Sequence, residues 1–233
     1  MSVVIVAGGT GGLGSAVCGA FVREGAVVIT TYRSPEEFEH LRSMLAENRS
    51  RVEGEQLDVT DEQDALRLVD RVLSRHARID GLVNAVGGYA GDTTLWKLER
   101  NVLDQMMALN VRSFYALARA VVPVLLKQSH GSIVNVVSKA ALDHRANESA
   151  YAASKAAALA MTDCLAAELT GTGVRVNSVL PSIIDTAANR RAMPKADFGK
   201  WPKPEDIAAV IAFLCSDAAK VIHGAAVPVY GGL

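Results

Sequence analysis

The stretch that decides the fold reads VVIVAGGTGGLG, residues 3–14 of the chain. Its first five residues are apolar and mostly β-branched, as in a buried strand, and its glycines come directly before a segment with helical spacing. Two spacings fit the glycines: Gly9-x-Gly11-x-x-Gly14 and Gly8-x-x-x-Gly12-x-Gly14. Either one permits a tight turn and lets backbone N–H groups at a helix N-terminus approach a pyrophosphate. The stretch predicts a dinucleotide-binding turn, the alternative being a glycine-rich turn that binds nothing.

Outward from this turn, strand-like and helix-like segments alternate along the whole chain. Apolar runs typical of strands cover residues 3–7, 26–31, 52–57, 81–85, 132–137, 174–179 and 226–229. Segments with helical spacing cover residues 13–23, 36–46, 62–75, 98–109, 111–126, 151–169 and 205–214. This alternation predicts right-handed βαβ units, and hence one α/β domain over residues 1–233. We expect a doubly wound, parallel, Rossmann-like sheet of about seven strands with helices on both faces.

Composition and charge exclude several other classes of protein. Half of the residues are apolar and 21% are charged, which suits a folded chain with a sizeable core. The 24 Lys and Arg nearly balance the 25 Asp and Glu, so the charge favours neither nucleic acid nor a membrane surface as partner. The three cysteines, Cys18, Cys164 and Cys215, are too few and too far apart for a disulfide framework or a metal site. With no signal-peptide pattern and no run of ~18 apolar residues, we expect a cytoplasmic protein.

A tyrosine and a lysine stand one helical turn apart in the run Tyr151-Ala152-Ala153-Ser154-Lys155. On one face of a helix, a cation beside a phenol favours the phenolate, which lowers the pKa of the phenol and makes it a usable proton donor. Ser138 ends a strand-like run and so lies at the carboxyl edge of the predicted sheet, where open α/β folds bind ligands. Each feature also has an ordinary interpretation, because such pairs are common on amphipathic helices and such serines often cap helices.

The order of these motifs resembles that of the short-chain dehydrogenase/reductase family, from the first strand to the last. The motifs are the Gly8-x-x-x-Gly12-x-Gly14 turn, Asp58-Val59, Asn84-Ala85-Val86-Gly87, Asn110, Ser138, Tyr151-x-x-x-Lys155, and Pro181 with Thr186. The separation of Ser138 from Tyr151 is also the usual one in that family. Three positions depart from the family pattern, Ala7 for Thr, Ala85 for Asn and Ser182 for Gly, and none of them is catalytic.

The resemblance implies a catalytic set of four residues: Asn110, Ser138, Tyr151 and Lys155. Tyr151 would be the acid in ketone reduction and the base in alcohol oxidation, and Lys155 would lower its pKa and bind the nicotinamide ribose. Ser138 would hold the substrate oxygen, and Asn110 would anchor a water that links Lys155 to solvent. The implied reaction is hydride transfer between a nicotinamide cofactor and a small-molecule carbonyl or secondary alcohol.

The resemblance also implies the residues that bind the cofactor. Asp58 and Val59 would contact adenine, and Ile183 with Thr186 would contact the nicotinamide carboxamide. The complete predicted set is Gly8, Thr10, Gly12, Leu13, Gly14, Arg33, Asp58, Val59, Asn84, Ala85, Gly87, Tyr151, Lys155, Ile183 and Thr186. No metal-ligand set is expected.

The end of the second predicted strand indicates which nicotinamide cofactor is used. NAD-specific sites have an acidic residue there that accepts hydrogen bonds from the ribose hydroxyls. Here Tyr32 stands at that position, Arg33 follows it, and no carboxylate appears before Glu36. The planar guanidinium of Arg33 suits a 2′-phosphate, so NADP(H) is the preferred cofactor, with NAD(H) as the second choice. Arg33 as a merely solvated residue is the other interpretation, since Gly11 occupies the second basic position of the glycine loop.

The expected function is therefore that of an NADP(H)-dependent oxidoreductase, and two alternatives stay open. One is a catalytically silent, dinucleotide-binding sensor or scaffold, against which the intact set of four residues argues. The other is a pteridine-type reductase. It ranks lower because relatives that reduce dihydropteridines can lack the catalytic serine, whereas Ser138 is present here. No residue identifies the substrate. Four residues are candidates to face it, the alternative being ordinary surface positions: Tyr89, His144, Arg145 and Glu148.

Two further expectations concern assembly and access to the site. Helices over 111–126 and 151–169 are apolar on more than one side, and the family builds its dimer interface from them, so a homodimer or homotetramer is predicted. Residues 184–203 lack periodicity, as a lid over the site would, and are fewer than in typical family members. We expect a short lid that leaves the cleft open. Its basic residues would favour an anionic substrate or simply be solvated: Arg190, Arg191, Lys195 and Lys200.

Overall fold

The computed structural model describes the whole chain, residues 1–233. Its strands are β1 (Val3–Ala7), β2 (Val27–Tyr32), β3 (Val52–Gln56), β4 (Gly81–Asn84), β5 (Gly131–Val136), β6 (Val174–Pro181) and β7 (Ala226–Val229). Its helices are α1 (Gly12–Arg23), α2 (Pro35–Met44), α3 (Glu62–His76), α4 (Arg100–Met107), α5 (Ser113–Gln128), α6 (Ser149–Glu168), α7 (Ala187–Ala192) and α8 (Pro204–Cys215). All seven predicted strands are present.

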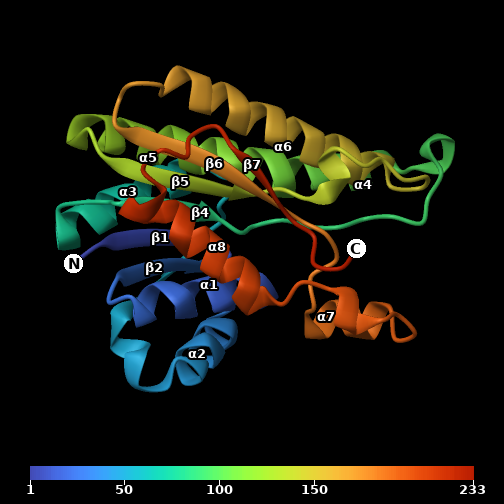
Figure 1. Ribbon diagram of the computed structural model, residues 1–233, viewed down its shortest axis with the longest axis horizontal. Helices are drawn as coiled ribbons and strands as arrows, with labels where there is room; N and C mark the ends of the chain where they lie inside the picture. Colours follow the sequence, from blue (N-terminus) through green and yellow to red (C-terminus); the bar gives the residue numbers. More distant parts are fainter.

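The strands form one parallel sheet in the order β3-β2-β1-β4-β5-β6-β7. From β1 the chain first builds outward through β2 and β3, then returns to β4 and builds the other half (Figure 1). This confirms the predicted doubly wound α/β fold. In such a sheet the crevice for ligands lies at the carboxyl edge where the order reverses, here between β1 and β4.

Two layers of helices cover the sheet, one on each face. Val3, Ile5 and Ala7 of β1 belong to a cluster of 23 buried residues shared with α3, α5 and α6. Val4 and Val6 belong to a cluster of 21 shared with α1, α2 and α8. Because successive side chains of a strand point to opposite faces, a wholly apolar strand needs both layers to be buried.

The helices expected over 98–109 and 111–126 are one continuous element, Arg100–Gln128. A single π-helical turn, Ala108–Arg112, joins α4 to α5 where a break was expected, and it contains Asn110. By length and composition this element could cross a membrane, but 56% of its most apolar window is buried inside the structure. It packs in the core with α3 and α6.

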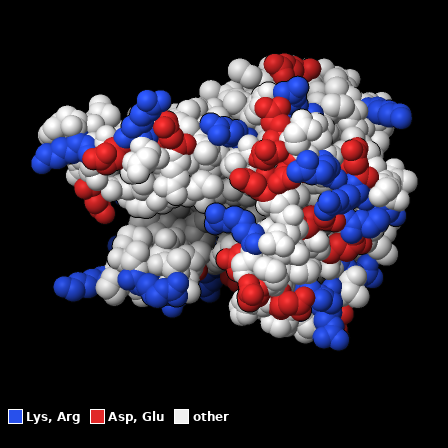
Figure 2. Space-filling view, turned by 180° about the vertical axis from the view of Figure 1, so that it is seen from behind, with Lys and Arg blue, Asp and Glu red and all other residues white.

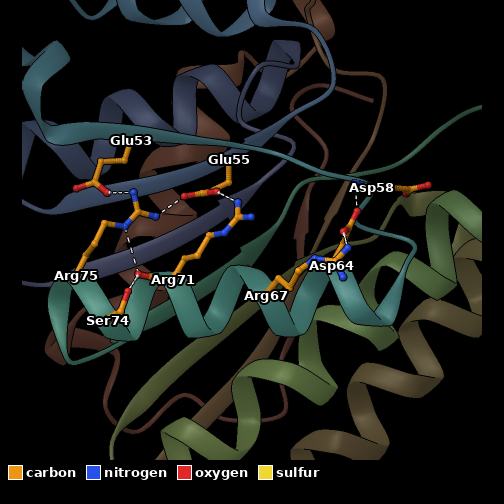
Figure 3. Close-up of polar contacts among 8 residues, drawn as sticks. All are labelled: Glu53, Glu55, Asp58, Asp64, Arg67, Arg71, Ser74 and Arg75. Carbon is orange, nitrogen blue, oxygen red and sulfur yellow. Dashed lines mark hydrogen bonds and ion pairs between the residues drawn. The ribbon is translucent and has the colours of Figure 1, made fainter.

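Ion pairs fasten α3 to β3, the edge strand of the sheet (Figure 3). Arg71 pairs with Glu55 at 2.6 Å, and Arg75 pairs with Glu53 at 2.9 Å and also with Glu55. Glu55 is 7% exposed, and the only other buried charged residue in the structure is Lys155. The carboxylate of Glu55 therefore lies between two guanidinium groups that neutralise it.

Candidate active site

The turn after β1 is packed too tightly to admit a side chain at Gly9 or Gly14. A Cβ on Gly14 would lie 2.1 Å from the carbonyl oxygen of Gly8, which itself has φ of +77°. The Thr31 hydroxyl at the end of β2 accepts a hydrogen bond from the Gly8 N–H at 3.0 Å. No side chain caps the N-terminus of α1, so its first N–H groups stay free for an anionic ligand.

A pocket of about 240 Å³ lies beside this turn. The predicted cofactor residues that line it are Gly8, Thr10, Arg33, Asp58, Val59, Ala85 and Gly87. The Tyr32 ring stacks on Phe38 of α2 with centroids 4.9 Å apart, which docks α2 against the end of β2. The neighbouring Arg33 is exposed, and its guanidinium forms no ion pair with any carboxylate.

Asp64 of α3 holds the loop after β3 that lines this pocket. Its carboxylate accepts a hydrogen bond from the backbone N–H of Asp58 at 2.9 Å (Figure 3). This hydrogen bond is the main reason that the pKa of Asp64 lies below its ordinary value. The Asp58 carboxylate accepts from the N–H and the hydroxyl of Thr60, at 2.9 and 2.8 Å. The segment predicted to contact adenine is thus fixed from both sides.

Asn84, at the end of β4, lies beneath the pocket and not in its lining. Its side chain is buried and donates to the Asn135 Oδ1 of β5 at 3.0 Å, and Asn135 donates in turn to the Thr162 hydroxyl of α6. The Asn84 Oδ1 accepts from the N–H of Val86 at 3.3 Å. Asn84, one of the predicted cofactor-binding residues, therefore supports the loop 85–87 that lines the pocket.

Asn110 fixes the other end of the same loop. Its Oδ1 accepts from the N–H of Gly88 at 2.9 Å, and its Nδ2 donates to the carbonyl of Gly88 and to the Ser154 hydroxyl. A Cβ on Gly87 would lie 2.9 Å from Asn110 Oδ1 and 3.1 Å from Lys155 Nζ. Gly87 thus lines the pocket and also lies against Asn110 and Lys155. Any larger residue there would collide with their side chains.

The second half of the site consists of Ser138, after β5, and two residues of α6, Tyr151 and Lys155. Lys155 is 5% exposed, and its Nζ donates to the carbonyl of Val136 at 3.2 Å. Burial lowers the pKa of Lys155 to about 8. The Ser138 oxygen accepts from the N–H of Ala140 at 3.1 Å, and its hydroxyl interacts with Tyr151, whose pKa it lowers by hydrogen bonding.

The pKa of Tyr151 is raised above its ordinary value, in the direction opposite to the one expected from the nearby lysine. Burial is the largest cause; the Ser138 hydroxyl opposes it by hydrogen bonding, and the charge of Glu148 adds to it. The sequence shows that Lys155 is near Tyr151, but it does not show how deeply the Tyr151 side chain is buried. Desolvation of the phenolate therefore sets the direction in which the pKa of Tyr151 is shifted.

Of the four residues placed to face a substrate, Tyr89 and Glu148 come together over Tyr151. The Tyr89 hydroxyl donates to the Glu148 Oε1 at 3.1 Å, and its ring meets the Tyr151 ring edge-on, with centroids 5.0 Å apart. His144 and Arg145 are exposed, and the His144 ring lies 3.3 Å from the carbonyl of Ala141. Tyr89 and Glu148 therefore cover one side of Tyr151, the candidate proton donor.

The segment 184–203 contains α7 and a single helical turn, Phe198–Lys200. Thr186 touches the glycine turn, since a Cβ on Gly12 would lie 2.9 Å from its Cγ2, whereas Ile183 is half-buried. Arg190 pairs with Asp185 at 2.5 Å and Lys200 with Asp197 at 3.8 Å, so two of the four basic groups are neutralised. Figure 2 shows an open hollow between the part of the molecule that carries α6 and the part that carries α7.

A family model described as enoyl-(acyl carrier protein) reductase matches residues 7–233. The chain belongs to the short-chain dehydrogenase/reductase family. The relatives include the 3-oxoacyl-[acyl-carrier-protein] reductase of Thermotoga maritima, which is 34% identical over an alignment of 239 positions that covers 99% of this chain and 97% of the relative. The D-threitol dehydrogenase of Mycolicibacterium smegmatis is 33% identical over an alignment of 239 positions that covers 99% of this chain and 92% of the relative.

Solved structures agree with this assignment. ElxO with NADP bound superposes with a TM-score of 0.93 at 25% identity, covering 99% of this chain and 98% of that one. Levodione reductase superposes with a TM-score of 0.93 at 27% identity, covering 99% and 96%. The relatives are named as dehydrogenases and reductases, and this short-chain dehydrogenase/reductase is accordingly an NAD(P)-dependent oxidoreductase.

The residues present fit a dinucleotide. Gly9 and Gly14 leave no room for a side chain, the first turn of α1 has free N–H groups, and Lys155 has three donors for one acceptor. No group of three or more His, Cys, Asp or Glu side chains is arranged to hold a metal ion. Three supporting residues were not found by the sequence analysis because each acts through a contact distant in sequence: Glu37, Asn135 and Ser154. Asp64, which was not found either, acts through Asp58, only six residues away.

Proposed function

We propose that this oxidoreductase transfers a hydride between NADP(H) and a small-molecule carbonyl or secondary alcohol, with Asn110, Ser138, Tyr151 and Lys155 as its catalytic set. The observation that carries the proposal is the burial of Lys155, whose ammonium has one protein acceptor for three donors. A buried cation with unused donors is unfavourable unless a ligand occupies them. Its position one turn after Tyr151 and beside Gly87 supports a role at the nicotinamide ribose.

Each catalytic residue has one task in the proposed reaction. Tyr151 donates its phenolic proton to the substrate oxygen in reduction and takes it back in oxidation. Ser138, whose oxygen is occupied by the Ala140 N–H, donates its hydroxyl proton to the same substrate oxygen. The Lys155 charge stabilises the phenolate as it forms. When bound, the nicotinamide supplies or accepts the hydride.

For Asn110 we propose the role of anchoring a water between Lys155 and solvent. Its Oδ1 accepts one hydrogen bond from Gly88 and keeps a second lone pair. The same oxygen and Lys155 Nζ both lie against Gly87, which supports a shared water at that place.

The proposed cofactor site uses the predicted set. The glycine turn with Thr10 and Leu13 would hold the pyrophosphate, Asp58 and Val59 the adenine, and Ile183 and Thr186 the carboxamide. Arg33 would bind a 2′-phosphate, and its exposed, unpaired guanidinium on the pocket supports this. A charged hydrogen bond of this kind contributes about 1.5–3 kcal/mol.

The cofactor preference is tested by kcat/KM with NADPH and NADH. We expect NADPH to be favoured by at least about tenfold in the wild type and Arg33→Ala to remove most of that margin, because the Arg33 interaction accounts for it. The affinity for NADH should change little in Arg33→Ala, which controls for a general disturbance of the pocket. Equal efficiency of the two cofactors in the wild-type enzyme would refute the preference.

Activity itself is tested by following nicotinamide absorbance with a panel of carbonyl compounds that includes reactive diketones. Turnover of ketones supports the proposal. Tight cofactor binding without turnover of any compound would favour the silent sensor, and turnover confined to dihydropteridines would favour the pteridine-type reductase.

Three properties of the molecule remain proposals beside this function. Residues 1–233 would form a single dinucleotide-binding domain in which 184–203 is a short lid, as the contact of Thr186 with Gly12 supports. The protein would be cytoplasmic. It would assemble as a homodimer or homotetramer through the outer faces of α4–α5 and α6.

A further inference from the structure

A carboxylate lies in the cofactor pocket although the strand end carries none. Glu37 belongs to the first turn of α2, and it lines the same pocket as Arg33 and Thr10. Its Oε2 accepts a hydrogen bond from the Thr10 hydroxyl at 3.3 Å. The space that would receive a 2′-phosphate is therefore bordered by one free cation and one free anion, because neither Arg33 nor Glu37 forms an ion pair.

The local sequence explains why Glu37 and not Glu36 reaches this pocket. Pro35 starts the helix directly after Ser34, and the stacking of Phe38 on Tyr32 fixes how α2 is rotated against the strand end. Successive residues of a helix point about 100° apart, so two adjacent glutamates cannot face the same way. Glu36 lies outside the lining of the pocket and accepts a hydrogen bond from the Ser34 hydroxyl instead.

We propose that Glu37 is a second specificity-determining residue for the cofactor and that it acts against Arg33. The inference rests on the proposed function, which places the adenosine end of the cofactor in this pocket. A carboxylate there repels a 2′-phosphate, whereas it accepts hydrogen bonds from the free ribose hydroxyls of NAD(H). The selectivity of the wild type is then the difference between two opposed contributions, and the carboxylate keeps NAD(H) usable.

Dissociation constants measured by calorimetry, without any turnover, test this directly. In Glu37→Gln we expect NADPH to bind about three- to tenfold more tightly and NADH to bind a few-fold more weakly. Arg33→Ala should move the ratio of the two constants in the opposite direction. Because both side chains are exposed, high salt should shrink both effects.

Glu36→Gln is the matched control. It removes the same charge from the same helical turn and so alters the interaction with the helix dipole by a similar amount. We expect it to leave the ratio of NADPH to NADH affinity unchanged.

The outcomes separate this inference from the function on which it rests. If the wild type binds NADPH but Glu37→Gln leaves the ratio as it was, or if Glu36→Gln changes it equally, Glu37 has no role in selection. If the wild type binds neither cofactor, the proposed function fails and the inference fails with it.

Discussion

At the scale of single residues, burial sets the proton affinities of the two groups that the proposed chemistry needs. The pKa of Lys155 is lowered to about 8, so at pH 7 most molecules still carry the ammonium. The pKa of Tyr151 is raised, mainly by burial, so the phenol holds its proton over the neutral range. A protonated phenol beside a charged lysine is the state from which a ketone can be reduced.

Removal of the phenolic hydroxyl tests this residue pair. Tyr151→Phe should fold normally and bind NADPH within about tenfold of the wild-type affinity, since at most one hydrogen bond is lost. Its kcat for ketone reduction should fall by about 10²- to 10⁴-fold, the usual contribution of a general acid. A variant that keeps more than about a tenth of the wild-type kcat would exclude Tyr151 as the proton donor.

The charge of Glu148 gives a second prediction at this scale, for the pH dependence. Its negative charge disfavours the Tyr151 phenolate and so helps to raise that pKa. In Glu148→Gln the pKa falls, and the rise of alcohol oxidation with pH, which follows formation of the phenolate, should begin at lower pH.

The fall of ketone reduction with pH should move in the same direction in this variant. Asp143→Asn, which removes an exposed carboxylate paired with Lys139, is the control and should leave both profiles in place. Profiles of Glu148→Gln that coincide with those of the wild type would contradict the effect.

Spacing along the sequence was sufficient to predict that Tyr151 and Lys155 lie one turn apart on a helix and that Ser138 follows a strand, and the structure has them there. It could not find Glu37, whose partner Thr10 is 27 residues away, or Asn135, whose partner Asn84 is 51 residues away. Spacing also gave the wrong direction for the pKa of Tyr151, since burial depends on what the rest of the chain places around a residue.

At the scale of elements, the position of the adenine loop depends on how α3 lies against β3. Asp64 joins the helix to that loop, and Arg71 and Arg75 join the same helix to Glu55. Because Glu55 is buried and both arginines are partly exposed, the carboxylate depends on these two partners for its stabilisation.

Neutralising Glu55 should therefore lower the stability of the protein while leaving its catalytic activity unchanged. In Glu55→Gln we expect the free energy of unfolding to fall by about 1–3 kcal/mol, or the Tm by roughly 2–10 °C, as measured by thermal unfolding. Glu39→Gln, which breaks an exposed pair with Arg42, should cost less than about 0.5 kcal/mol. Equal losses in the two variants would mean that burial of Glu55 has no consequence.

Element types were predictable because strands and helices differ in the period of their apolar residues. The join between α4 and α5 was not, since residues 108–112 continue the helix through a π-turn that has no sequence period of its own. The N-cap of α3 is Asp61, whose carboxylate accepts from the N–H groups of Gln63 and Asp64.

At the scale of the whole molecule, the outer faces of α4–α5 and α6 lack a partner. Leu103, Tyr115 and Leu126 are between 38% and 40% exposed on α4–α5, and the exposed residues of α6 include Ala153, Ala160 and Ala167. Small alanines let another helix approach closely, and exposed apolar side chains gain from being covered.

Light scattering at micromolar concentration should accordingly report a dimer or a tetramer of the 24.6 kDa chain. Ala160→Glu, which places a charge in the middle of the exposed face of α6, should shift the particle toward the monomer with little effect on the circular dichroism of the fold. A particle of about 25 kDa for the wild type would rule out assembly under these conditions.

The π-turn between α4 and α5 limits which insertions and deletions of residues the helix can tolerate. A π-turn holds one residue more than an α-turn, so losing one residue there would regularise the helix hydrogen bonds. The remaining α4 would then be rotated by about 100° relative to α5, and Asn110 would be turned away from Gly88 and Ser154. A deletion of one residue within Ala108–Arg112 is therefore expected to break the contacts of Asn110 even though it makes the helix more regular.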